Sequence, residues 1–172
     1  MPKTDFYQQL GLGIASIVFG MALSIFVYAA TTSVQGASAW MLFIISFLIM
    51  LRCWWRYTTV FIQYAPSHTF WHFLTDFAIA FFGILGVLFV NNIRVWALLG
   101  GASMLMCALR CWLAKPVATA RKPVRQTLWG AISMLIALTI VYYLAPTVSH
   151  TTLATAFLVI VTLFVLYTAK KP

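Results

Sequence analysis

Residues 69–90 read TFWHFLTDFAIAFFGILGVLFV, and this stretch decides which fold the chain can adopt. It is long enough to cross a bilayer as a helix, for which about 20 apolar residues suffice. One of its residues is Asp76, and the whole sequence has only two acidic side chains. A carboxylate at that depth is costly to ionise, so it must be neutral, paired or reached by water. Asp76 is therefore the first candidate functional residue.

The composition of the whole chain is that of a membrane protein. Hydrophobic residues make up 63% of the 172 residues, charged residues make up 8%, and the mean hydropathy is +0.98. A soluble domain carries about 25% charged residues, so this chain cannot cover a water-facing surface and lipid must be its solvent. We predict an all-α integral membrane protein that forms a single membrane domain over residues 1–172. Its six transmembrane helices are predicted at about 9–31, 39–61, 69–90, 94–114, 126–145 and 151–169.

The basic residues sort to one side of these six spans. With the N-terminus in the cytosol, only Arg94 of the 11 Lys and Arg residues falls outside. This bias predicts a multi-pass protein of the cell membrane, the inner membrane in a Gram-negative cell, with both termini cytosolic. It also accounts for the net charge of +9, so we expect the bilayer and anionic lipids at its cytosolic face as partners, and no nucleic acid. The cytosolic set is Lys3, Arg52, Arg56, Arg110, Lys115, Arg121, Lys122, Arg125, Lys170 and Lys171.

A weak internal repeat divides the spans into pairs. The tetrapeptide LRCW closes the second span at residues 51–54 and the fourth at 109–112. We therefore predict three tandem helical hairpins, at about 6–57, 69–116 and 124–171, and a basic loop at 115–125 that sets topology. Stripes of small residues permit close backbone approach, so we expect them to pack the bundle internally, with a homo-oligomer as the alternative. The stripes are Ser16, Gly20 and Ser24; Gly100, Ser103, Cys107 and Cys111; and Gly130, Ser133 and Ala137.

One candidate polar cluster lies within the membrane-spanning segments. If the third helix begins by His68, then His68, His72 and Asp76 share one helix face at i, i+4 and i+8. Two basic side chains close the second span and one closes the fourth, so Asp76 has room to pair with Arg52 or with Arg110. The full cluster is His68, His72, Asp76, Arg52, Arg56 and Arg110.

Three hypotheses for this cluster stay open. The first is a structural ion pair that fixes how the helices dock. The second is a protonation site that senses or conducts protons, since histidine titrates near neutral pH. The third is a metal or cation site built from two histidines and one aspartate.

Catalytic motifs are missing from the sequence. It contains no HExxH pair, no glycine-rich phosphate loop, no CxxC pair and no Ser/His/Asp set, so we predict no enzyme, no cofactor and no catalytic or metal-binding residue. The three cysteines are Cys53, Cys107 and Cys111, an odd number on the cytosolic side. We interpret them as small interface residues rather than as disulfide partners.

The order of motifs along the hairpins carries a resemblance. Phe70-Trp71 opens the second hairpin, Arg110-Cys111-Trp112 closes it, and the third hairpin runs from Trp129-Gly130 through Ala145-Pro146 to His150. In these features the chain resembles the small bacterial HdeD-type acid-resistance membrane proteins. The resemblance implies six spans in three hairpins and a role in tolerance of acid stress at the inner membrane.

We therefore expect a non-catalytic membrane protein with a stress-tolerance or accessory role. Two alternatives stay open. One is a small ion channel or proton-coupled transporter that uses Asp76 and His72. The other is a subunit of a larger membrane complex.

Overall fold

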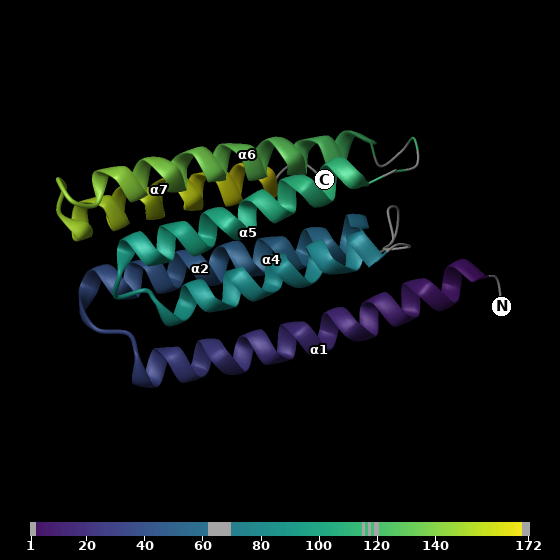
Figure 1. The fold of residues 1–172 in the computed structure, drawn as a ribbon, viewed down its shortest axis with the longest axis horizontal. Coiled ribbons are helices and arrows are strands. Elements are labelled where there is room, and N and C mark those ends of the chain that lie inside the picture. Colours follow the sequence, from purple (N-terminus) through teal and green to yellow (C-terminus); the bar gives the residue numbers. More distant parts are fainter. Residues whose placement is uncertain (1–2, 62–69, 115, 117, 119–120, 170–172) are drawn as a thin grey trace.

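A computed structural model describes the backbone of residues 3–61, 70–114, 116, 118 and 121–169, and the side chains of 13, 16–59, 71–114, 116, 118 and 121–166. The described elements are all helical, and consecutive helices run antiparallel (Figure 1). They are α1 (Lys3–Thr32), α2 (Gly36–Arg56), a π-helical turn η1 (Tyr57–Phe61), α4 (Phe70–Leu88), α5 (Ile93–Leu113), α6 (Arg121–Leu144) and α7 (His150–Ala169).

The all-α class is confirmed, and each α-helix overlaps one predicted segment. The two largest boundary errors are at the starts of α1 and α6, which begin at Lys3 and Arg121, earlier than the predicted spans at 9 and 126. The expected basic loop at 115–125 is wrong in its second half, because Arg121, Lys122 and Arg125 belong to the first turns of α6. Pro123 fits there, since a proline lacks only an N–H that the first helical turn leaves without a partner in any case. The start of an apolar run in the sequence marks where the chain would enter the hydrocarbon layer of a membrane. The helix itself can begin several residues before that point.

In the part of the chain that the structure describes, four helices are long and apolar enough to cross a membrane. Within the described residues, the apolar parts of α1 and α7 are shorter, at Ser16–Thr32 and His150–Leu166. Helices of this length and composition indicate a membrane protein. The four are Gly36–Thr59, Trp71–Leu88, Ile93–Leu113 and Arg121–Leu144.

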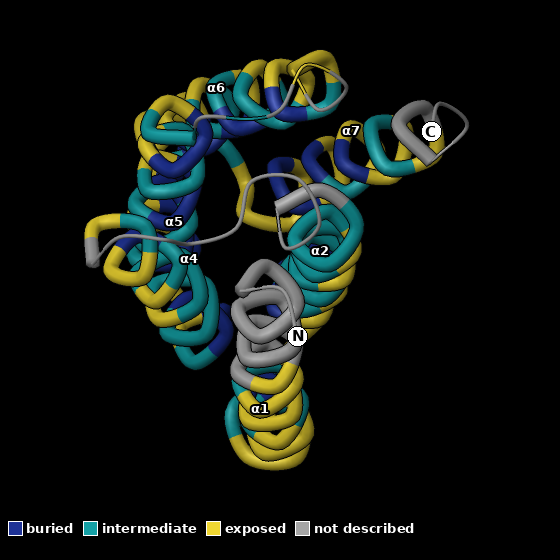
Figure 2. The backbone as a smooth tube through the Cα atoms, turned by 90° about the vertical axis from the view of Figure 1, so that its right-hand side faces the viewer, coloured by how far each residue is buried: buried dark blue, intermediate teal, exposed yellow. Residues whose placement is uncertain are grey.

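The helices form two rows that face each other (Figure 2). In one row α5 packs between α4 and α6, and in the other α2 packs along α7. The rows meet where α4 contacts α1 and α2. Of the helix pairs that belong to one predicted hairpin, α4 and α5 are the pair that packs closely. The close contacts of α5 with α6 and of α2 with α7 join different predicted hairpins.

The buried core lies in the half of the bundle that contains the α4–α5 and α6–α7 connections. It joins the start of α2, the start of α5, the end of α6 and the start of α7. The Trp96 ring meets the Phe157 ring edge-on at 5.7 Å, and its Nε1 donates a hydrogen bond of 2.8 Å to Ser46 Oγ. Residues at the centre of this core include Leu42, Ile45, Ile93, Leu138, Ala154 and Val161.

Large apolar side chains also cover the outside of the bundle. Exposed aromatic residues mark the two ends of this apolar surface. Trp40 and Trp55 lie near the two ends of α2, and Trp129 and Tyr143 lie near the two ends of the apolar part of α6; all four are exposed. At 1.5 Å per residue, the backbone positions of each pair are about 21–23 Å apart along their helix. Tyrosine and tryptophan concentrate at both membrane–water interfaces, so this surface has the pattern of a lipid-facing band.

Asn91 joins two connections at one end of the bundle. Its Oδ1 accepts a hydrogen bond of 3.1 Å from the Gln35 backbone N–H, and its Nδ2 donates to the Ser33 carbonyl. The α1–α2 connection is completed by Gly36, whose φ of 79° favours glycine. The loop between α4 and α5 thereby holds the loop between α1 and α2.

Small residues do lie at several helix contacts, as expected. A Cβ added at Gly100 would lie 3.3 Å from Leu138 Cδ1, and one at Gly130 would lie 3.1 Å from Phe164 Cζ. The stripe on α1 is different, because Gly20 is exposed and a Cβ added there would meet nothing within 4 Å. The expectation that the α1 stripe packs inside the bundle is therefore wrong.

Candidate functional site: a polar clamp between three helical elements

Asp76 forms an ion pair with Arg110 across the α4–α5 interface. Arg110 Nε donates a hydrogen bond of 2.9 Å to Asp76 Oδ1. The Arg110 side chain is 2% exposed and the Asp76 side chain is 12% exposed. Arg110 stands in the last turn of α5, where the helix dipole favours a cation. A charge-assisted hydrogen bond between buried groups fixes the relative position of both helices.

Tyr57 brings a third element to the same carboxylate. Its hydroxyl donates a hydrogen bond of 3.1 Å to Asp76 Oδ2. Tyr57 is the first residue of η1, the π-helical turn that continues α2. We call Tyr57, Asp76 and Arg110 the polar clamp, because together they tie the end of α2 to α4 and α5.

Sequence reasoning missed Tyr57. It concentrated on charged partners for Asp76, whereas a phenol hydroxyl can satisfy a carboxylate oxygen just as a cation can. The available signal was position: Tyr57 directly follows Arg56, at the depth where partners for Asp76 were sought.

His72 lies one turn before Asp76 and contacts the end of α5. Its Nε2 lies 3.1 Å from the Leu113 carbonyl oxygen and donates to it, since a carbonyl can only accept. Leu113 is the last residue of α5, where carbonyl groups have no partner within the helix. His72 therefore caps α5, and His68 lies outside the described residues.

A third polar contact continues the α4–α5 seam toward the core. Ser103 Oγ donates a hydrogen bond of 2.9 Å to the Ile79 carbonyl, and a Cβ added at Gly83 would lie 3.6 Å from that Oγ. The contacts of His72, Asp76 and Ile79 therefore follow each other at steps of four and three residues along α4. Their partners descend along α5 in the opposite order, as an antiparallel pair requires.

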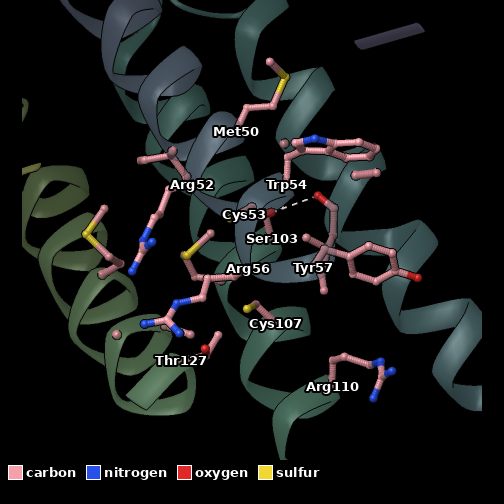
Figure 3. A pocket seen from close by; sticks show the side chains of 18 of the residues that line it. Met50, Arg52, Cys53, Trp54, Arg56, Tyr57, Ser103, Cys107, Arg110 and Thr127 are labelled. Carbon is pink, nitrogen blue, oxygen red and sulfur yellow. Dashed lines mark hydrogen bonds between the residues drawn. The ribbon is translucent and has the colours of Figure 1, made fainter. Parts of the chain in front are cut away.

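Arg52 and Arg56 line a cavity at the end of α2. In Figure 3 their guanidinium groups extend from α2 toward α6, in the region of Thr127. Asp76, Tyr57 and Arg110 line the same cavity. Four residues of the predicted cluster, Arg52, Arg56, Asp76 and Arg110, thus line one space, with the polar clamp on one wall, whereas His72 is not part of the lining.

The described residues hold no group of three or more His, Cys, Asp and Glu side chains arranged for a metal ion. The three cysteines are free thiols, with Cys111 buried and Cys53 and Cys107 half-buried. All three lie in helix interfaces or in the cavity wall. Chemically, the site provides the Asp76 carboxylate, held by Arg110 and Tyr57, and a cavity lined by several basic side chains.

Comparison with protein-family models finds no match for this chain, and comparisons with curated proteins and with solved structures find none either. The function must therefore be argued from the residues themselves.

Proposed function

We propose that this protein is a non-catalytic, six-span protein of the inner membrane, with both termini in the cytosol and an accessory role in tolerance of stress. Along the sequence, the six spans follow each other as three tandem hairpins. Acid stress is the role that the resemblance to HdeD-type proteins implies. The basic residues at one end of the bundle and the exposed aromatic residues at both ends support this placement.

The observation that carries the non-catalytic, non-conducting proposal is the bonding of Asp76. Both of its carboxylate oxygens accept hydrogen bonds, one from Arg110 and one from Tyr57. A carboxylate that carries ions must exchange its partner with each ion that passes. A carboxylate held by groups from two other elements is suited to docking helices, as intramembrane charges commonly are.

A proton-flux measurement tests this proposal against the channel alternative. The purified protein is reconstituted into liposomes that contain a pH-sensitive dye, and a proton gradient is applied with and without a potassium diffusion potential. Wild type should give the same flux as empty liposomes. Asp5→Asn serves as the matched control for Asp76→Asn, because Asp5 precedes the first predicted span.

Flux through wild type that survives in Asp5→Asn and disappears in Asp76→Asn would establish the channel or transporter and overturn the proposal. The stress role is measured separately, by survival of cells with and without the protein after an acid challenge. Equal survival would remove the stress role. A stable partner that co-purifies in mild detergent would point to a subunit of a larger complex.

A further inference from the structure

A cavity of about 1070 Å³ lies between the two rows of helices. This volume is at the upper end of the roughly 300–1,000 Å³ of ligand pockets. Small side chains leave the space open, because glycine, alanine and serine residues occur on the walls contributed by α1, α4, α5 and α6. They include Ala22, Ala80, Gly83, Gly100, Gly130 and Ser133.

One end of the cavity is strongly basic. Five cationic side chains line it, two from α2 and three from the first turns of α6: Arg52, Arg56, Arg121, Lys122 and Arg125. The whole sequence has two acidic side chains, and Asp76 already accepts from Arg110 and Tyr57. The chain therefore holds too few carboxylates to balance this end of the cavity.

The start of α6 adds to the positive potential. The first turn of α6 contains no acidic residue, although the helix dipole places partial positive charge there and favours an anion. Arg121 and Lys122 stand in that turn, against the preference of the dipole. An anion bound between α2 and α6 would satisfy both the dipole and the cations.

The opposite end of the cavity is apolar. Its walls there include the half-buried Ile49 and Ile84 and the buried Phe26, Trp96 and Leu138. From Arg110 to Trp96 along α5 the cavity runs about 21 Å at 1.5 Å per residue. One leaflet of a bilayer contributes about 15 Å of hydrocarbon, so an acyl chain fits this depth.

We infer that this cavity binds an anionic amphiphile, with a phosphate or carboxylate head among the cations of α2 and α6 and an acyl chain in the apolar part. Guanidinium groups bind phosphate and carboxylate through paired hydrogen bonds, which suits Arg52 and Arg56. A lipid of the surrounding bilayer and a free fatty acid share this chemistry. The site goes beyond the proposed function, and its test does not depend on flux or on acid survival.

The test is ligand binding to the full-length protein in neutral detergent, measured by native mass spectrometry. The probes are phosphatidylglycerol, phosphatidylcholine, oleate and inorganic phosphate. Phosphatidylglycerol or oleate should bind at least tenfold more tightly than phosphatidylcholine, and phosphate alone should not compete. Preference for phosphatidylglycerol identifies a lipid headgroup, and preference for oleate identifies a free acid.

Charge variants test the basic end. Lys122→Gln with Arg125→Gln changes two exposed residues, so folding is not at risk, and it should weaken binding roughly tenfold per charge removed. Arg94→Gln is the matched control, because Arg94 lies at the other end of the bundle and stacks on Tyr142. Equal effects of the two changes would overturn the inference, as would equal binding of phosphatidylglycerol and phosphatidylcholine.

Size variants and chain length test the apolar end. Ser133→Phe introduces a large ring into the cavity wall, whereas Ile136→Phe places the same ring at an exposed position of α6 that does not line the cavity. Only Ser133→Phe should reduce binding. For saturated fatty acids of eight to twelve carbons, the Kd should fall about fourfold per methylene. A Kd that does not depend on chain length, or equal loss in both phenylalanine variants, would show that no chain enters the cavity.

Discussion

The polar clamp gives a stability prediction that can be worked from its geometry. Replacing Asp76 with alanine leaves the Arg110 guanidinium charged in a side chain that is only 2% exposed. Removing one partner of a buried ion pair costs about 3–5 kcal/mol. The lost Tyr57 hydrogen bond adds about 0.6 kcal/mol, the average for such bonds between membrane helices. At roughly 2–4 °C per kcal/mol for a chain of this size, Asp76→Ala should lower the Tm by about 7–22 °C.

Thermal unfolding in detergent with a thiol-reactive dye measures this change. Cys111 is buried and Cys53 and Cys107 are half-buried, so the thiols should react fully only when the helices separate. Tyr57→Phe is the graded control, because it keeps the ring and removes only the hydroxyl. It should lower the free energy of unfolding by about 1 kcal/mol or less.

A double-mutant cycle decides whether the pair is coupled. Asp76→Leu combined with Arg110→Met removes both charges, and replacing a buried ion pair with apolar residues is often neutral. The double variant should therefore be more stable than Asp76→Leu alone. If the effects of the two single substitutions simply add, Asp76 and Arg110 do not interact and the reasoning about the polar clamp is wrong.

Two further changes probe the helix contacts. Gly100→Ala should be nearly neutral, because its Cβ would displace only the tip of Leu138, whereas Gly100→Leu should overpack the α5–α6 contact and cost about 1–3 kcal/mol of unfolding free energy in the same thermal assay. Asn91→Ala should speed hydrogen exchange at residues 33–36 about fivefold by removing the bonds to Ser33 and Gln35, with the seam residues 72–76 as the unchanged control. Unchanged exchange at 33–36 would contradict the role of Asn91.

The helices were predictable because the signal for each of them is local. Each one contains an apolar run, and most connections contain polar residues such as Asn91 and Asn92 or a proline such as Pro146. The start of α6 was missed because Arg121 and Lys122 are polar residues that continue a helix beyond hydrocarbon. A hydropathy pattern shows which residues would lie in the hydrocarbon layer of a membrane. The start of a helix is decided instead by backbone hydrogen bonding, which can begin outside that layer.

The partners of Asp76 were only partly predictable. Arg52 and Arg110 lie at similar depth on different helices, so helix spacing left both open as partners. Choosing between them requires the order of helices around the bundle, which depends on packing between distant segments. In lipid the outer face of a helix is as apolar as its inner face, so the sequence does not distinguish them. The exposed stripe of Gly20 on α1 and the packing of α2 on α7 were missed for that reason.

The pairing of α2 with α7 has a consequence for how the protein is made. Leu42 and Ile45 on α2 share their buried core with Ala154 and Val161 on α7, more than 100 residues later in the chain. If the helices insert in chain order, as the proposed membrane location requires, α2 enters the bilayer long before its packing partner exists, and lipid must cover that face until the last helix is inserted. The two rows can close only then. A ribosome-bound chain that ends before residue 150 should therefore be an inserted but open bundle, and the final helix acts as the closing step of assembly.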